Sequence, residues 1–318
     1  MLKGVLAFVA VIGSVLGSQE RYTYNGELWK REIDLVDYGK MDLMKTWSDW
    51  IQYFGKEYSS VEEEYKRFGI FLENLQKIAL WNTDSSNGAS LRPNQFTDLT
   101  NEEFVQYVHG KNGRCISEVN RPRFIIGGGH KLPTSRNKIP DSVDWEAAGK
   151  VTPVKNQGNC GSCWSFSTTG SIECNYAIAN NELNSLSEQQ LIDCSQAEGN
   201  EGCNGGEMDD AFKYVIETGG LCTEEAYPYI AATGKCKDSS CGPFYDPIVN
   251  YTNVRKQDEQ ALEEATALGC VSVAIEANQF AFQYYSSGVL TGECGTNLDH
   301  GVLVVGYGTE DGQDYWKV

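Results

Sequence analysis

A short segment around Cys163 constrains this chain more than any other feature of its sequence. Gly, Asn and Ser residues between Gln157 and Ser162 predict a loop. No proline interrupts the residues from Trp164 to Ala179, so they predict a helix whose apolar side chains can line a buried face. Cys163 would then lie at the amino-terminal end of this helix, where unpaired N–H groups and the helix dipole stabilise a thiolate. Such an environment lowers the pKa of a cysteine and makes its sulfur a nucleophile.

A thiolate nucleophile also needs a general base and a group that stabilises the oxyanion. The chain has three histidines, His109, His130 and His300, and only His300 lies downstream of Cys163. His300 is the candidate base, and the family resemblance described below carries this assignment. The side-chain amide of Gln157, together with the backbone N–H of Cys163, would form the oxyanion hole.

The pair Cys160 and Cys163 permits two other interpretations, a redox pair or half of a zinc site. A redox pair needs a compact βαβ context, and a zinc site needs a second cysteine pair at similar spacing. Neither pattern occurs near these residues. A lone histidine is more often structural than catalytic, so the assignment of His300 depends on its combination with Cys163. A redox protein remains an alternative, which a Cys160–Cys203 disulfide together with a free Cys163 would exclude.

The segment from Gln157 to Ser167 resembles the active-site segment of the papain-like cysteine proteases. His300 follows Cys163 at about the 130–150 residues typical of such enzymes. The resemblance implies an endopeptidase in which the Cys163 thiolate attacks the peptide carbonyl and His300 protonates the leaving amine. It implies no cofactor and no metal. A helical half followed by a β-rich half also predicts an α+β fold, with a papain-like cleft between the two domains.

Two patterns upstream resemble the inhibitory propeptide of cathepsin L-like enzymes. Apolar spacing predicts a helix over residues 41–54, ended by Gly55, and a longer helix over residues 60–82. One stripe of the longer helix matches the ERFNIN pattern, and a second motif follows with Arg92 in place of its usual glycine. The matching residues are Glu63, Arg67, Phe71, Asn74, Ile78 and Asn82 in the first motif, and Asn94, Phe96 and Asp98 in the second.

These features divide the chain into three parts. Residues 1–17 are typical of a signal peptide, because a basic start precedes an apolar run that is too short to span a membrane. No membrane association is expected after its removal. Residues 18–138 would form the propeptide, which ends in an extended, cleavable linker over residues 111–138. Residues 139–318 would form the peptidase domain.

The chain ends at Val318, before the Asn-Ser-Trp-Gly segment and the closing strands that the resemblance implies. We therefore expect a C-terminally incomplete domain that lacks the asparagine that orients His300 and is inactive as given. A second hypothesis is a non-catalytic homologue whose propeptide half inhibits related proteases.

The resemblance also identifies residues that would bind substrate. Two glycines after Cys203 would offer backbone groups to an extended peptide. The pocket for the residue two before the scissile bond would be apolar, so it would accept Leu, Val or Phe and reject a charge. The two glycines are Gly205 and Gly206, and the pocket residues are Met208, Ala274, Leu298 and Gly301.

Eleven cysteines in a chain with a signal peptide suggest disulfide bonds. The resemblance implies that Cys163 stays free. Cys174 and Cys270 are most simply buried, small apolar side chains. Cys115 and Cys294 have no assigned partner. The implied bridges are Cys160–Cys203, Cys194–Cys236 and Cys222–Cys241.

The formal net charge of −18 argues against nucleic acid as a partner. The resemblance implies protein and peptide substrates, the chain's own propeptide as an intramolecular inhibitor, and cystatin-like inhibitors. The signal peptide implies the secretory pathway and then the lysosome, the vacuole or the extracellular space. Asn250 begins an Asn-Tyr-Thr sequon for glycosylation there. We also expect Asp98 and Glu63 to pair with basic groups such as Arg67, so that acid loosens the propeptide.

Overall fold

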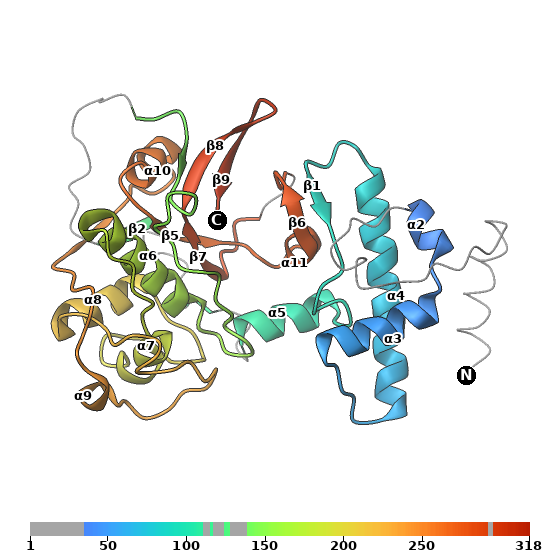
Figure 1. Ribbon diagram of the computed structural model, residues 1–318, viewed down its shortest axis with the longest axis horizontal. Helices are drawn as coiled ribbons and strands as arrows, with labels where there is room; N and C mark the ends of the chain where they lie inside the picture. The colour runs from blue at the N-terminus through green and yellow to red at the C-terminus, as the bar shows by residue number, and fades with distance from the viewer. Residues whose placement is uncertain (1–34, 111–114, 117–123, 128–138, 292–294) are drawn as a thin grey trace. The chain divides into compact units, whose positions relative to one another are not determined.

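The computed structural model divides the chain into two compact units (Figure 1). The residues that it describes are 35–110, 115–116, 124–127, 139–291 and 295–318. Unit 1 comprises Met1–Phe104 with Gln279–Cys294, and unit 2 comprises Val105–Asn278 with Gly295–Val318. The expected signal peptide, His130 and Cys294 lie outside the described residues. Within the described ranges, no helix is both long enough and apolar enough to cross a membrane.

Unit 1 contains the two helices predicted from apolar spacing, and both predictions are confirmed. Helix α3 (Leu43–Phe54) begins after Asp42, whose side chain accepts a backbone N–H, and ends at Gly55 with a φ of 60°. Helix α4 (Val61–Thr83) begins after Ser60, which caps it in the same way. The other elements are α2 (Leu35–Lys40), β1 (Ala89–Leu91), α11 (Phe280–Tyr284) and β6 (Tyr285–Gly288), and β1 pairs antiparallel with β6.

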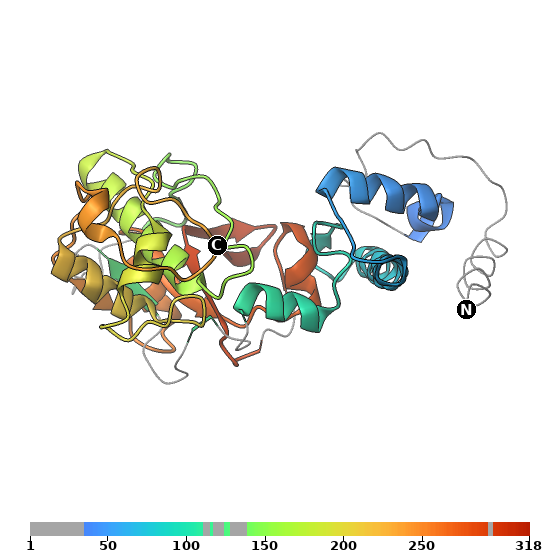
Figure 2. The ribbon, with the colours of Figure 1, turned by 90° about the horizontal axis from the view of Figure 1, so that it is seen from below.

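An aromatic cluster forms the core of unit 1. Trp47 and Trp50, on α3, have ring centroids 5.3 Å apart, and both rings contact Phe71 of α4. The indole N–H of Trp50 donates to the carbonyl oxygen of Asn94 at 3.1 Å. Figure 2 looks almost along the axis of α4 and shows α2 and α3 on one side of it. Phe71 and Ile78 of the ERFNIN stripe are fully buried, so this motif supplies part of the core.

Unit 2 combines helices with antiparallel sheets, in agreement with the predicted α+β class. A four-stranded sheet has the order β4-β2-β5-β7, and a three-stranded sheet has the order β3-β8-β9. The helices are α6 (Cys163–Asn180), α7 (Glu188–Cys194), α8 (Met208–Thr218), α9 (Asp238–Cys241) and α10 (Glu259–Thr266), and α5 (Asn101–His109) crosses the sequence boundary between the units. The strands are β2 (Phe124–Gly127), β3 (Val143–Asp144), β4 (Tyr251–Asn253), β5 (Val271–Ile275), β7 (His300–Val304), β8 (Gly306–Glu310) and β9 (Gln313–Lys317).

Strand β2 corrects the expectation of a linker without structure over residues 111–138. It lies between β4 and β5 and pairs antiparallel with both. The hydrogen-bonding partners of this short strand are more than 100 residues away along the chain. A local pattern around the three consecutive glycines cannot reveal such partners, and the sequence therefore predicted only an extended segment.

Helix α6 is buried on nearly all sides, whereas the sequence predicted a single buried apolar face. Several of its polar side chains form hydrogen bonds with neighbouring elements. The hydroxyl of Ser167 donates to the carbonyl of Val302 on β7 at 2.7 Å, and the hydroxyl of Ser272 on β5 donates to the carbonyl of Ser167 at 2.8 Å. The buried carboxylate of Glu173 accepts from Lys155 at 2.8 Å. The two serine hydrogen bonds fix α6 against the four-stranded sheet.

Five disulfide bonds link described cysteines. Three of them join the pairs that the resemblance implied, Cys160–Cys203, Cys194–Cys236 and Cys222–Cys241. The expectation that Cys174 and Cys270 are unbonded apolar side chains is wrong, because they form a fourth disulfide. Their Cα atoms are 5.9 Å apart because α6 packs beside the start of β5. The fifth disulfide involves Cys163.

Candidate active site

Cys163 is the first residue of α6, at the helix terminus that the sequence predicted. Its Sγ accepts the backbone N–H of Gly301 at 3.1 Å. Gly301 lies on β7, where the register pairs it with Ala274 and pairs the adjacent His300 with Ile275. The packing of α6 on this sheet therefore brings together a cysteine and a histidine that are far apart in the sequence.

His300 lies next to the sulfur of Cys163. One side-chain atom from each of Cys115, Cys163 and His300 lies within 4.8 Å of the other two. The ring of His109, from α5, has its centroid 5.7 Å from that of His300. Burial, together with the nearby His109, lowers the pKa of His300 to about 3. In this state His300 is neutral at neutral and mildly acidic pH.

The expectation that Cys163 stays free is wrong for this state of the protein. Cys163 forms a disulfide with Cys115, and both residues are buried. A disulfide sulfur carries no negative charge, and the thiolate–imidazolium pair expected with His300 is absent. Cys160 is bonded to Cys203 and Cys163 is bonded to Cys115, so these two cysteines do not pair with one another as the redox interpretation requires. Only the first half of the expected exclusion, the Cys160–Cys203 disulfide, is met, because Cys163 is not free.

The side-chain amide of Gln157 is held by two carbonyl groups. Its Nε2 donates to the carbonyl of Val108 at 2.6 Å and to that of Cys160 at 2.9 Å. Val108 belongs to α5, upstream of the expected peptidase domain. A carbonyl oxygen of the expected propeptide therefore accepts from the amide that was predicted to stabilise an oxyanion.

The propeptide chain continues past Val108 in close contact with the active-site loop. Gly110, at a φ of 71°, lies so near that an added Cβ would be 2.8 Å from the carbonyl oxygen of Cys203. An added Cβ on Gly161 would likewise be 2.7 Å from the carbonyl oxygen of His109. Both glycines are needed here because their backbones approach without a side chain between them.

Residues 115 and 116 then pair with the backbone on both sides of the nucleophile. The N–H of Cys115 donates to the carbonyl of Asp299 at 3.3 Å, and the N–H of Gly206 donates to the carbonyl of Cys115 at 3.2 Å. Ile116 forms a parallel bridge with Gly206. The backbone of Gly206, which the sequence predicted to bind substrate, is thus occupied by residues 115 and 116 of the expected propeptide. Gly205 precedes it with a φ of 121°, which favours glycine.

The residues predicted to form an apolar pocket belong to one hydrophobic cluster. Met208 and Ala274 are buried within it, and Leu298 packs against it. An added Cβ on Gly301 would lie 3.2 Å from the Sδ of Met208, so these two residues are neighbours. Ile116 is 2% exposed and belongs to the same cluster. The expected propeptide therefore contributes a branched aliphatic side chain to the same hydrophobic cluster as three of the predicted pocket residues.

Comparison of the sequence with models of known protein families identifies the family to which the chain belongs. Residues 139–318 match the family described as "Papain family cysteine protease", and residues 47–104 match the "Cathepsin propeptide inhibitor domain". The chain belongs to the papain family of cysteine proteases.

Several known proteins are similar in sequence to this papain-family chain over most of its length. It is 44% identical to a probable cysteine protease of Arabidopsis thaliana over 85% of its own length and 58% of that protein. It is also 44% identical to a KDEL-tailed cysteine endopeptidase of Arabidopsis thaliana, over 81% of the chain and 71% of the relative. The structure of digestive procathepsin L 3 from Tenebrio molitor matches with a TM-score of 0.76 and 40% identity, over 86% and 87% of the two chains. The chain thus spans less than two thirds of the first of these relatives.

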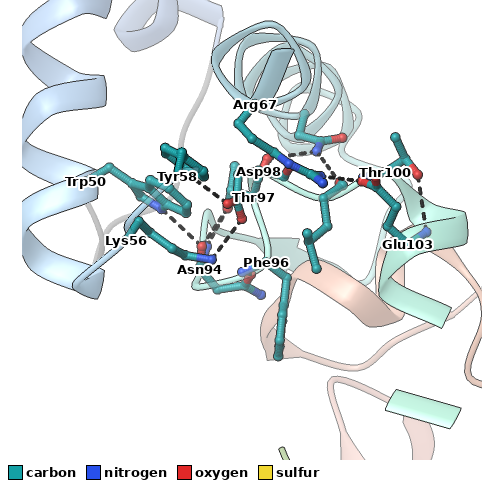
Figure 3. Close-up of polar contacts among 12 residues, drawn as sticks. Trp50, Lys56, Tyr58, Arg67, Asn94, Phe96, Thr97, Asp98, Thr100 and Glu103 are labelled. Atoms are coloured by element: carbon teal, nitrogen blue, oxygen red, sulfur yellow. Dashed lines mark hydrogen bonds and ion pairs between the residues drawn. The ribbon is translucent and has the colours of Figure 1, made fainter. Parts of the chain in front are cut away.

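The propeptide motifs of this papain-family chain converge on a network of charges in unit 1 (Figure 3). The guanidinium of Arg67 donates to Glu63 at 2.7 Å and to Glu103 at 2.5 Å, and it reaches only the backbone carbonyl of Asp98. The carboxylate of Asp98 instead accepts from Lys56 at 3.0 Å and from the hydroxyl of Tyr58 at 2.9 Å. The expected pairing of Glu63 with Arg67 is therefore confirmed, whereas Asp98 has a different basic partner.

The asparagines of the two propeptide motifs bind backbone groups. Asn74 donates to the carbonyls of Thr97 and Leu99 at 2.9 Å each, and so ties α4 to the segment that carries the second motif. The remaining motif side chains also lie inside unit 1. Asn82 bonds both backbone groups of Leu91, Asn94 donates to the carbonyl of Gln283, and the ring of Phe96 contacts that of Phe104.

The pairing of Glu103 with Arg67 makes unit 1 sensitive to acid. Burial alone would raise the pKa of Glu103, but hydrogen bonds from Arg67 and the Thr100 N–H outweigh it and hold that pKa below the ordinary value of 4.5. A carboxylate with a depressed pKa in the folded state stabilises the fold above its unfolded pKa. This stabilisation is lost as the pH falls through the folded pKa.

We expect Glu103→Gln to lower the thermal unfolding temperature of the full chain at neutral pH and to have much less effect near about pH 3. The unfolding temperatures of the wild type and the variant should therefore converge as the pH falls through the lowered folded pKa of Glu103. Glu62→Gln, which changes an exposed carboxylate on α4, is the matched control and should have little effect at either pH. Equal differences at both pH values would remove the Arg67–Glu103 pair from the acid response.

Proposed function

We propose that this protein is a cysteine endopeptidase of the papain type, made as a zymogen that its own propeptide keeps inactive. The observation that carries the proposal is the position of Cys163 at the start of α6 beside His300 of β7. The family match over residues 139–318 supports the same activity.

The chemistry follows from the groups around the sulfur. Once Cys163 is a thiolate, the terminus of α6 and the N–H of Gly301 stabilise its charge. It attacks the peptide carbonyl, and the oxyanion accepts hydrogen bonds from Gln157 and from the Cys163 N–H. His300, charged when it faces a thiolate, protonates the leaving amine and then activates the water that hydrolyses the acyl-enzyme.

Inhibition by the propeptide is supported by what residues 105–116 occupy in unit 2. The carbonyl of Val108 accepts from the proposed oxyanion donor, Cys115 and Ile116 take the backbone positions beside Gly206, and Ile116 is buried in the apolar cluster. A substrate needs the same groups and cannot bind at the same time. Cystatin-like inhibitors that enter the cleft would likewise bind only after this segment leaves.

The chemistry of the pocket supports a preference for a hydrophobic residue two before the scissile bond. Met208, Ala274 and Leu298 offer no polar side-chain atom to a charged residue, and burying an uncompensated charge is costly. The activated enzyme should therefore hydrolyse a Leu-Arg amide and leave the matching Asp-Arg amide intact. Hydrolysis of both at similar rates would contradict the preference, and hydrolysis of neither would contradict the proposed activity.

We expect Gly301→Ala to narrow this pocket. The added Cβ would lie 3.2 Å from the Sδ of Met208. The ratio of kcat/KM for Phe over Val two before the scissile bond should then fall about 10-fold. A ratio is the right measurement because the substitution also lies near Cys163 and can slow all substrates alike. An unchanged ratio would locate the pocket away from Gly301.

We also propose that the chain passes through the secretory pathway. Five disulfides among the described cysteines support an oxidising compartment. The KDEL tail named in one relative is typical of the endoplasmic reticulum. From there the enzyme would reach the vacuole, the lysosome or the extracellular space.

Asn250 should carry an N-linked glycan if this location is right. It is exposed and lies immediately before β4. Expression in a glycosylating host should give a product whose mass falls on treatment with a glycosidase, and Asn250→Gln should remove that difference. No mass difference in the wild type would contradict occupancy of the sequon.

A further inference from the structure

The Cys115–Cys163 disulfide gives the zymogen a second, covalent form of inhibition. Resting on the function proposed above, we propose that Cys115 is a redox cap and that a thiol reductant must remove it before Cys163 can act. The observation is direct, since the disulfide joins a propeptide residue to the sulfur that would attack substrate. Cleavage of the chain after Ile116 does not break this bond. The cut propeptide would therefore remain attached to the nucleophile.

Reduction of the cap is an ordinary exchange in two steps. A thiolate of the reductant attacks the Sγ of Cys115, which forms a mixed disulfide with Cys115 and releases Cys163 as a thiolate. A second thiol of the reductant then attacks the mixed disulfide and releases Cys115 as a thiolate. Two reductant thiols are oxidised to one disulfide, and their two electrons reduce the Cys115–Cys163 bond. A dithiol reductant supplies both thiols in one molecule.

The surroundings of Cys163 favour its departure as a thiolate when the reductant attacks Cys115. Exchange is faster when the leaving thiolate is the more stable one. Cys163 leaves as a thiolate at the start of α6, where its sulfur already accepts the N–H of Gly301. The first step therefore delivers the nucleophile in its reactive form.

Burial determines how readily the cap is reached. Cys115 and Cys163 are 0% and 1% exposed, and the backbone of Cys115 is bonded to Asp299 and Gly206. A reductant reaches the sulfur only when residues 115 and 116 lift away from Gly206. Loosening of the propeptide and reduction should therefore promote one another, and either treatment alone should be slow to activate the protein.

The first test is a disulfide map that needs no activity. Full-length zymogen is alkylated with iodoacetamide under denaturing conditions without reductant, digested, and examined by mass spectrometry. The proposal predicts a linked peptide pair containing Cys115 and Cys163 and no alkylation of Cys163. Alkylated Cys163 in most molecules would overturn the proposal, as would stoichiometric zinc held by reduced Cys115, Cys163 and His300. Neither result would contradict the proposed peptidase activity.

The second test compares activation of three zymogens by acid, with and without a dithiol. The wild-type zymogen should not become active without the dithiol. A non-reducing gel should show its cleaved propeptide still attached to the peptidase domain. Cys115→Ser should activate without the dithiol, and cleavage after residue 116 leaves an enzyme of wild-type sequence. Ile116→Ala keeps the disulfide but weakens the packing beside it, and it should remain as dependent on the dithiol as wild type. Equal dithiol dependence of Cys115→Ser and wild type would overturn the cap. All three zymogens are expressed as the complete natural protein. Inactivity of all three under every condition, with the Cys115–Cys163 bond present in the map of the wild type, would instead contradict the proposed peptidase function.

Discussion

Replacement of Cys163 by alanine should reduce the peptidase activity of the activated protein by about 10⁴-fold or more. The substitution removes the only sulfur that lies at the start of α6 beside His300 in the described part of unit 2. Without it, the attack on the peptide carbonyl has no protein nucleophile, although substrate can still bind. Hydrolysis of a Leu-Arg amide measures the loss.

The matched control for this substitution is Cys115→Ala. It breaks the same disulfide and leaves the nucleophile in place, so any loss of stability from the missing bond is common to both variants. We expect the Cys115→Ala protein to hydrolyse the amide after activation. If Cys163→Ala retained the activity of this control, Cys163 would not be the nucleophile.

The second large effect is expected in the aromatic core of unit 1. Trp50→Ala removes a fully buried indole whose ring contacts Trp47, Phe54 and Phe71. The substitution also removes the hydrogen bond that the indole N–H donates to the carbonyl of Asn94. Loss of such a side chain typically costs about 3–5 kcal/mol. Because domains are stable by only about 5–15 kcal/mol, unit 1 should lose a large share of its stability.

This loss should appear as a lower unfolding temperature and as faster digestion of the propeptide by an added protease. Tyr53→Ala on the same helix is the control, since Tyr53 is 55% exposed. A substitution at such a position changes stability by only about 0.5 kcal/mol. Equal resistance of the Trp50→Ala variant and this control to the protease would show that Trp50 does not hold unit 1 together.

The elements that the sequence predicted well are those encoded by neighbouring residues. Helices α3 and α4 carry apolar stripes at helical spacing between local caps, Asp42 and Gly55 for one and Ser60 for the other. The position of Cys163 at a helix start follows from the same kind of local signal. The prediction that Cys163 lies near His300 came only from the family resemblance, because no local pattern in the sequence predicts how α6 packs on β7.

The features that the sequence missed depend on contacts between distant segments. Strand β2 pairs with β4 and β5, and no pattern in the residues of β2 predicts these two partner strands. The sequence predicted a buried apolar face on α6, yet its polar residues Ser167 and Glu173 are buried as well, because neighbouring segments supply their hydrogen-bonding partners. Asp98 pairs with Lys56 for the same reason, since a loop brings that lysine to it.

One feature of the sequence pointed to the Cys115–Cys163 disulfide. Cys115 is a cysteine upstream of the expected peptidase domain to which the resemblance assigned no partner. An unassigned cysteine in a chain with a reactive thiol is a reason to test for a bond between them. The contacts of His109 and of the Val108 carbonyl had no such signal, since they arise from the path of the propeptide backbone.

The central claim is that the propeptide withholds Cys163 until activation. The most direct measurement is the reaction of an epoxide inhibitor with the protein at intervals during treatment with acid and a dithiol, with the labelled residue identified by mass spectrometry. The account predicts no label on the intact zymogen, followed by label on Cys163 alone that rises in step with loss of the propeptide. Full labelling of Cys163 in the untreated zymogen, or labelling of a different residue after activation, would contradict it.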